Sequence, residues 1–148
     1  MDSNKLTRFL EAQNQVYLKA LLEIKKGHKE THWMWFVFPQ IKGLDFSESS
    51  NFYGIEDLEE AKQYLSHPVL GKHLIEISTV LLQLKGKTAL QIFGQSDYMK
   101  LRSCMTLFAG ITISNPIFEQ VIEKYFDGLQ DEYTLQLLLK NKFSNDTV

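Results

Sequence analysis

The residues whose chemistry points to a functional site lie around one aromatic segment, residues 32–41, or well downstream of it. His32 is the natural acid or base, because an unperturbed imidazole titrates near neutrality, and Asp97 is the second catalytic candidate. The ligand-binding candidates carry cationic, hydroxyl, amide, imidazole or aromatic groups, and they are Lys29, Trp33, Gln40, Ser47, Tyr53, His67, Lys100, Arg102 and Ser103. No spacing rule joins these residues, which stand out only by type and by their place beside apolar anchors.

The predicted site is a cleft in which His32, Asp97, Lys100 and Arg102 converge beside the aromatic segment. That segment, HWMWFVFPQI, is too apolar to be exposed, so it should anchor its polar neighbours to the core. A helix that begins near Asp97 would bury its apolar stripe, which includes Leu101, Met105 and Phe108, and leave Lys100 off that face. We predict that these three residues, with Trp33 and Phe36 of the aromatic segment, are largely buried. A helix N-terminus with nearby cations suits a phosphate or another small anion.

Each part of this site also has a simpler structural explanation. Asp97 and Lys100 lie three residues apart and would form an exposed ion pair on a helix. Residues 42–53 are rich in hydroxyl groups, which could bind a ligand, but they lack a helical period and are typical of a solvated loop. Trp33 and Trp35 could stack a nucleobase, although aromatic residues in so apolar a run more often belong to the core.

Familiar catalytic and cofactor motifs are absent: the sequence has no P-loop, dinucleotide fingerprint, HExxH or GxSxG. His28 and His32 are four residues apart and could bind a metal on a helix, but Gly27 and the polar turn disfavour a helix there. Cys104 lies on an apolar stripe, where a buried thiol is usually inert. We therefore predict neither a metal site nor a cofactor.

Composition favours a globular protein with one domain. A chain of 148 residues, 44% apolar and 23% charged, is long enough for one hydrophobic core. Its net charge of −2 gives no global attraction to nucleic acid or to an anionic membrane, and no apolar run approaches the roughly 20 residues of a membrane span. The single cysteine and the absence of a signal-peptide stretch predict a cytoplasmic location.

Apolar residues at three- and four-residue spacing predict an all-α fold. The expected helices cover residues 3–26, 56–65, 68–86, 96–109, 116–127 and 131–140. Residues 33–38 are expected to form a short buried helix or an irregular segment, and residues 88–93 a helical turn or a short strand. Ser96 and Asp131 are the expected caps of their helices, and Gly71 indicates close packing or a break. We predict one compact multihelical bundle over residues 1–148, with at most a minor strand pairing and a frayed tail from about residue 142.

Five stretches, RFLEAQNQVY, HWMWFVFPQIKGL, YLSHPVLGKHL, IFGQSDYMKLRSCMTLF and DEYTLQLLL, occur here in the order found in a known family. The chain resembles the domain-of-unknown-function family number eighteen-ten over nearly its whole length. Members are often labelled calpastatin, but a calpain inhibitor is a disordered repeat and this pattern is globular. The resemblance implies a mainly α-helical single domain and no established activity. The chain departs from the family at Asp45, where glycine is usual, and at His73, where arginine is usual.

Two functions from different classes fit these features. The first is binding or hydrolysis of a phosphorylated or nucleotide-like small molecule, and KLRSCMTLF is similar to a segment of an ADP-ribose-linked glycosidase family. The second is a non-catalytic protein-interaction module or a homodimer. A pocket lined by His32, Lys100 and Arg102 would favour the first, and a flat apolar patch would favour the second. Neither function requires nucleic acid or a membrane as a partner.

Overall fold

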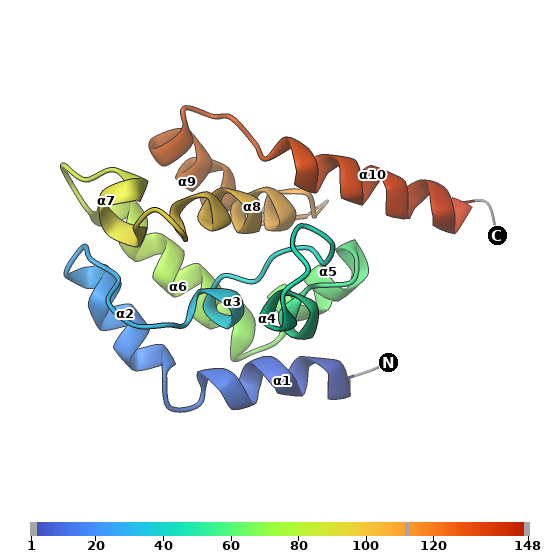
Figure 1. The fold of residues 1–148 in the computed structure, drawn as a ribbon, viewed down its shortest axis with the longest axis horizontal. Coiled ribbons are helices and arrows are strands. Elements are labelled where there is room, and N and C mark those ends of the chain that lie inside the picture. Colours follow the sequence, from blue (N-terminus) through green and yellow to red (C-terminus); the bar gives the residue numbers. More distant parts are fainter. Residues whose placement is uncertain (1–2, 112, 147–148) are drawn as a thin grey trace.

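The computed structural model describes residues 3–111 and 113–146, and these residues form ten helices (Figure 1). In chain order they are α1 Ser3–Gln13, α2 Tyr17–Lys25, α3 Met34–Val37, α4 Glu48–Tyr53, α5 Leu58–Ser66, α6 Leu70–Gln83, α7 Ala89–Phe93, α8 Tyr98–Ala109, α9 Ile117–Phe126 and α10 Glu132–Asp146. A single parallel β-bridge joins Ile41 to Ile55. The prediction of an all-α fold with only a minor strand pairing is confirmed.

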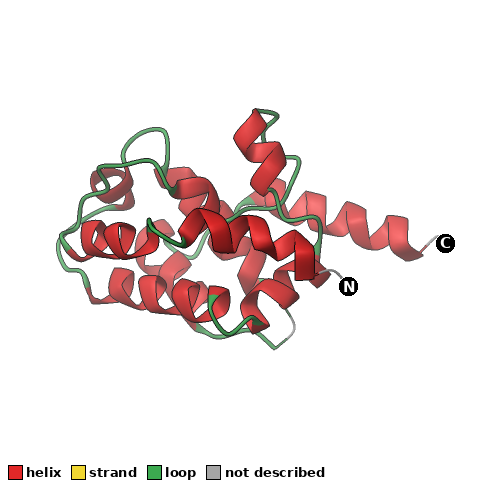
Figure 2. Ribbon diagram, turned by 90° about the horizontal axis from the view of Figure 1, so that it is seen from below, coloured by secondary structure: helices red, strands yellow, loops and turns green. Residues whose placement is uncertain are grey.

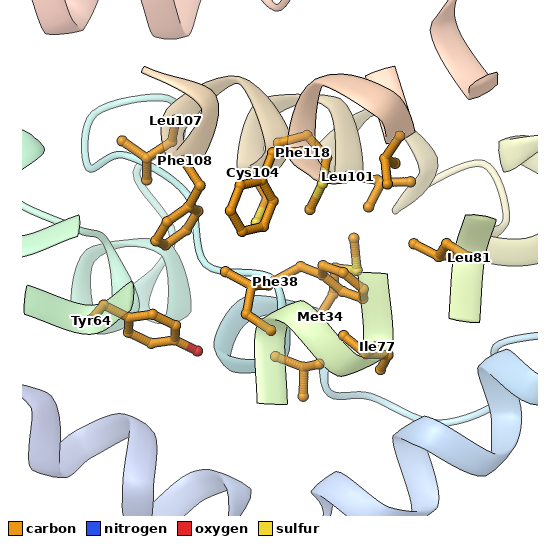
Figure 3. Packing of buried hydrophobic residues seen from close by; sticks show 14 of the residues in the cluster. Met34, Phe38, Tyr64, Ile77, Leu81, Leu101, Cys104, Leu107, Phe108 and Phe118 are labelled. Atoms are coloured by element: carbon orange, nitrogen blue, oxygen red, sulfur yellow. The ribbon is translucent and has the colours of Figure 1, made fainter. Parts of the chain in front are cut away.

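Helices α6 and α8 form the centre of the bundle. Helix α8 packs on α5, α7, α9 and α10, whereas α6 packs on α2, α5 and α9. Figure 3 shows side chains from both central helices meeting in one apolar cluster. Of the residues predicted to be in the core, Trp33, Leu101, Met105 and Phe108 are buried and Phe36 is half-buried. Cys104 is also buried, and burial raises the pKa of its thiol.

The single helix predicted over residues 3–26 is wrong, because a turn at residues 14–16 divides it into α1 and α2. The last residue of α1, Gln13, is buried, and its side-chain amide donates to the Phe36 carbonyl over 2.7 Å and to the Tyr64 hydroxyl over 3.0 Å. Its carbonyl oxygen lies 2.7 Å from Nδ1 of His73. These tertiary bonds favour the turn, although the apolar spacing alone would continue the helix.

The loop predicted over residues 42–53 is also wrong at its end, where α4 forms. The Ser47 hydroxyl accepts from the backbone N–H of Ser50, and Glu48 occupies the first turn, where a negative charge stabilises the helix dipole. Ser50 is buried and its hydroxyl donates to the carbonyl of Asp45. Helical periodicity is invisible in so short a helix, so the capping serine and the first-turn glutamate are its local signals.

Two helix ends differ from the prediction. Helix α8 begins at Tyr98 without a side-chain cap, so Ser96 does not cap it. Helix α10 is capped by Asp131 as predicted, but it continues six residues past Lys140, because no glycine or proline in residues 141–146 stops it. In Figures 1 and 2 this helix projects from the body of the bundle. Residues 147–148 of the predicted frayed tail lie outside the described residues.

Close packing explains Gly71 in α6. A Cβ atom at this position would lie 1.9 Å from the carbonyl oxygen of Leu65, so no other residue fits without moving the backbone. The glycine therefore lets the end of α5 approach the start of α6. Among the helices of residues 3–111 and 113–146, none has the length and apolar run that crossing a bilayer requires.

Replacing Ser78 with alanine is expected to stabilise the fold. Ser78 is fully buried in α6, and its hydroxyl has no hydrogen-bond partner among the described residues. Removing an unpaired buried hydroxyl should raise the free energy of unfolding by about 1 kcal/mol and Tm by about 2–4 °C. Urea unfolding of both proteins measures the change, and a loss of stability would show that an ordered water satisfies this hydroxyl.

Candidate functional site

A buried carboxylate in α2 positions the start of the aromatic segment. Glu23 is 6% exposed, and its Oε1 accepts from the backbone N–H groups of Glu30 and Thr31 and, over 2.8 Å, from the Trp33 indole N–H. The Thr31 hydroxyl donates to its Oε2 over 2.6 Å. Burial alone would raise the pKa of Glu23, but these hydrogen bonds outweigh it and lower the pKa to about 2. Glu23 is therefore ionised and holds residues 30–33 in place.

This segment borders a pocket of about 190 Å³. Helix α3, the N-terminal end of α8 and helix α4 contribute its walls, although these elements are distant in the sequence. The lining residues are Lys29, His32, Trp33, Met34, Trp35, Phe36, Ser49, Tyr53 and Asp97. Five of the predicted site residues, Lys29, His32, Trp33, Tyr53 and Asp97, thus lie in one cavity.

Asp97 links two lysines at one side of this pocket. Its Oδ2 lies 2.8 Å from Nζ of Lys29, and its Oδ1 lies 3.0 Å from Nζ of Lys100. The Lys29 ammonium is nearly buried, whereas Lys100 is partly exposed and lies over the Trp35 ring, 4.6 Å from its centroid. Burial would raise the pKa of Asp97, but the bonds from Lys29 and Lys100 lower it. The cluster therefore carries two cations and one anion, a local charge of +1.

Both lysines keep one hydrogen-bond donor outside these contacts. Lys29 donates to the Thr31 carbonyl and to Asp97, and Lys100 donates to the Ser96 carbonyl and to Asp97. An ammonium has three N–H groups, so each retains one in the described part of the protein. Each carboxylate oxygen of Asp97 is bonded to one lysine, which suits Asp97 to positioning the lysines and not to transferring protons.

Three side chains that line the pocket have polar groups without a protein partner. The His32 imidazole, the Ser49 hydroxyl and the Tyr53 hydroxyl make no hydrogen bond or ion pair with the residues that the structure describes. The half-buried Trp35 adds an aromatic wall. The pocket thus combines unpaired donors and acceptors, an aromatic surface and a cationic side, which are the groups that bind small polar ligands.

The remaining predicted site residues do not line this pocket. Lys100 lies beside the pocket, where it contacts the lining residues Trp35 and Asp97, and Gln40 lines a small neighbouring cavity. Ser47 caps α4, and Nδ1 of His67 accepts from the backbone N–H groups of Val69 and Leu70 at the start of α6. Ser103 and Arg102 make their contacts elsewhere. Ser103 is buried and its hydroxyl donates to the Met99 carbonyl, and Arg102 lies 3.5 Å from Asp131.

The predicted convergence of four residues therefore holds in part. His32, Asp97 and Lys100 gather at the pocket, and Asp97 also forms the simple helical ion pair with Lys100 that the spacing suggested. Arg102 is placed elsewhere, because a residue five positions after Asp97 points to another side of α8, where Asp131 pairs with it. Ser49 was predicted only as one of the hydroxyl groups of residues 42–53 that could bind a ligand, and Glu23 was not predicted, since it belongs to no motif.

Two larger cavities lack this combination of groups. One of about 510 Å³ is mostly apolar and lies between α5 and Ile111 with Ile113. Another of about 490 Å³ includes the carboxylates of Glu119, Glu123 and Glu132. Size alone would favour them, but we favour the smaller pocket because its aromatic wall and charged cluster supply specific contacts. No cluster of three or more potential metal ligands occurs within residues 3–111 and 113–146.

The fold closely matches a solved structure. The crystal structure of the conserved hypothetical protein Rv1873 from Mycobacterium tuberculosis superimposes with a TM-score of 0.88 at 45% sequence identity, over 90% of this chain and 96% of that one. No curated protein matches the chain significantly. A family described as protein of unknown function (DUF1810) matches residues 3–138. This match covers most of the chain, which therefore belongs to that family, as the sequence resemblance implied.

Proposed function

We propose that the protein binds a small phosphorylated or nucleotide-like molecule in the pocket beside α3. The observation that carries this proposal is the Lys29–Asp97–Lys100 cluster, whose charge of +1 adjoins an aromatic wall and unpaired polar groups. A phosphate would accept from the free N–H groups of the two lysines, and charge-assisted hydrogen bonds of this kind are the strong ones. The flat part of the ligand would contact Trp35.

The size of the pocket limits the ligand. A cavity of 190 Å³ is smaller than the roughly 300–1,000 Å³ of pockets that enclose drug-sized molecules. It suits a molecule no larger than a sugar phosphate or a mononucleotide, and an ADP-ribose-like molecule would place only one end inside it. If the ligand is also hydrolysed, His32 is the acid or base, because Asp97 is engaged by two lysines. The proposal includes the cytoplasmic location predicted from the single cysteine.

Thermal unfolding in the presence of AMP, UMP, ribose 5-phosphate and ADP-ribose tests this proposal. A compound at about one hundred times its Kd stabilises a folded protein by about 2.7 kcal/mol, which should raise Tm by at least about 5 °C. Lys100→Gln should abolish most of this rise while leaving the unliganded Tm nearly unchanged, because the Lys100–Asp97 pair is partly exposed.

Lys62→Gln is the matched control, because Lys62 is an exposed lysine that lines the 510 Å³ cavity instead. It should keep the full rise in Tm. If Lys62→Gln loses the rise in Tm and Lys100→Gln keeps it, the ligand binds in the 510 Å³ cavity instead. No rise with any compound would contradict the proposal.

Homodimerisation or another protein interaction is the second candidate function. Phe46 lies two residues before α4 and is 81% exposed, and Phe52 lies within α4 and is 58% exposed. Two large exposed rings on one short segment suit a protein interface, where aromatic residues are enriched. A dimer in light scattering that Phe46→Ser dissociates, together with no response to the four compounds, would favour this candidate over ligand binding.

A further inference from the structure

A buried amide lies behind the pocket without a hydrogen-bond partner. Gln40 is 7% exposed, and its Nε2 is buried and makes no hydrogen bond with any of the described residues. The side chain lines a cavity of about 10 Å³ together with Trp35, Ser50 and Tyr53. Native proteins rarely leave a buried donor unpaired, because the lost hydrogen bonds to water are not replaced.

The small cavity adjoins the pocket through two aromatic side chains. Trp35 and Tyr53 line both spaces, so their rings form the wall between the pocket and Gln40. Tyr53 is half-buried, and its hydroxyl is unpaired within the described residues. A change of side-chain rotamer, which is common on ligand binding, would open this wall and join the two spaces.

The backbone holds Gln40 firmly at this place. Its carbonyl accepts from the N–H of Ile55 over 2.8 Å, and the next residue, Ile41, forms the β-bridge with the same residue. Lys42 continues the pairing, because its N–H donates to the Ile55 carbonyl over 2.8 Å. The backbone position of Gln40 is therefore set by paired backbone on its C-terminal side and by Pro39 before it.

We infer that Gln40 determines ligand specificity by donating a hydrogen bond from Nε2 to a carbonyl oxygen on the ligand's flat ring. This inference rests on the proposed function and narrows its ligand class to phosphorylated molecules with an oxo-substituted heterocycle. The ring would contact Trp35 and Tyr53, the two aromatic side chains that line both spaces. Its phosphate lies at the Lys29–Asp97–Lys100 cluster.

Matched nucleotide pairs test the inference. IMP has a carbonyl where AMP has an amino group, and AMP has no other ring carbonyl. We expect IMP to bind at least about tenfold more tightly than AMP, which is the oxo preference that the inference requires, because a site built around a hydrogen bond rejects an analogue that cannot make it. UMP and CMP differ in the same way at ring position 4, but CMP keeps its carbonyl at position 2, so this second pair shows which ring carbonyl accepts the bond. Isothermal titration calorimetry measures the four dissociation constants.

Two substitutions separate this role from a structural one. Gln40→Met keeps the shape of the side chain, so it should abolish the oxo preference while Tm stays the same or rises by about 2–4 °C, because an unpaired buried donor is removed. Gln40→Glu offers an acceptor in the same place and should reverse the preference toward CMP and AMP. Gln120→Met, on the exposed surface of α9, is the control and should change neither quantity.

The outcomes distinguish the inference from the function on which it rests. If nucleotides bind without an oxo preference, or if Gln40→Met keeps that preference, the inference is wrong and the proposed function stands. If Gln40→Met lowers Tm by more than about 4 °C, a buried water or another structural partner satisfies the amide, and the inference is again wrong. If none of the four nucleotides binds, the proposed function fails for nucleotides together with the inference.

Discussion

Replacing Phe108 with alanine is expected to lower the free energy of unfolding by about 3–5 kcal/mol, as for other buried aromatic residues. Phe108 is completely buried in α8, and its ring centroid lies 5.5 Å from that of Tyr64 and 5.7 Å from that of Phe118 (Figure 3). Its removal would leave a cavity at the junction of α5, α8 and α9. Urea unfolding should therefore show a large fall in the midpoint without a large change in slope.

Phe46→Ala is the matched control, because it removes the same side chain from a position that is 81% exposed. Its effect should stay within about 0.5 kcal/mol, as for most surface substitutions. A loss below about 1 kcal/mol for Phe108→Ala would show that the core around α8 can collapse to fill the space.

Replacing Glu23 with glutamine is expected to destabilise the protein by about 3 kcal/mol at neutral pH. The substitution keeps the shape of the side chain but removes the charge that accepts four hydrogen bonds from Glu30, Thr31 and Trp33. The same bonds fix residues 30–33, at the start of the aromatic segment. The variant should therefore also bind ligand more weakly, since Lys29 and His32 lie within or beside this turn.

The effect of Glu23→Gln should depend on pH. The pKa of Glu23 falls from its usual value of 4.5 to about 2 in the folded protein, so the unfolded chain binds more protons between these values. The stability that Glu23 contributes is therefore complete above about pH 4.5 and is lost as the pH falls toward about 2. The difference in unfolding free energy between wild type and Glu23→Gln should shrink when urea unfolding is repeated at about pH 3.

Glu30→Gln provides the control for this experiment. Glu30 lies in the same turn, but its side chain is exposed, so the substitution should change stability by no more than about 0.5 kcal/mol at either pH. A difference between wild type and Glu23→Gln that stays constant between about pH 7 and pH 3 would contradict an ionised Glu23 as the acceptor of these bonds.

Several elements were predictable because their signals are local. The apolar stripe of α8 predicts that Leu101, Met105 and Phe108 lie in the core, and they do. Asp131 is the predicted cap of α10, and its carboxylate accepts a hydrogen bond from the N–H of Thr134, three residues later. Gly71 indicated close packing or a break, and the structure has the close contact, at the Leu65 carbonyl. Periodicity, capping and glycine placement act within a few residues, so they can be identified without knowing the fold.

The two elements that were predicted wrongly lack a local periodic signal, for different reasons. The turn after Gln13 forms because its amide bonds to residues 23 and 51 positions away, Phe36 and Tyr64. Helix α4 is only six residues long, too short to show a periodic pattern. Local propensity is a weak term that tertiary hydrogen bonds override.

The pocket shows the same difference between local signals and contacts of distant segments. Residue types around the aromatic segment marked His32, Lys29, Asp97 and Tyr53 in advance, and all four line the cavity. Their arrangement depended on the tertiary structure: Asp97 pairs with Lys29 across 68 positions, and Arg102, only five residues after Asp97, pairs with Asp131 on another side of α8. Local periodicity determines which residues face the core, but the packing of α3, α4 and α8 determines which polar side chains meet, because a contact between distant segments has no signature in either segment alone.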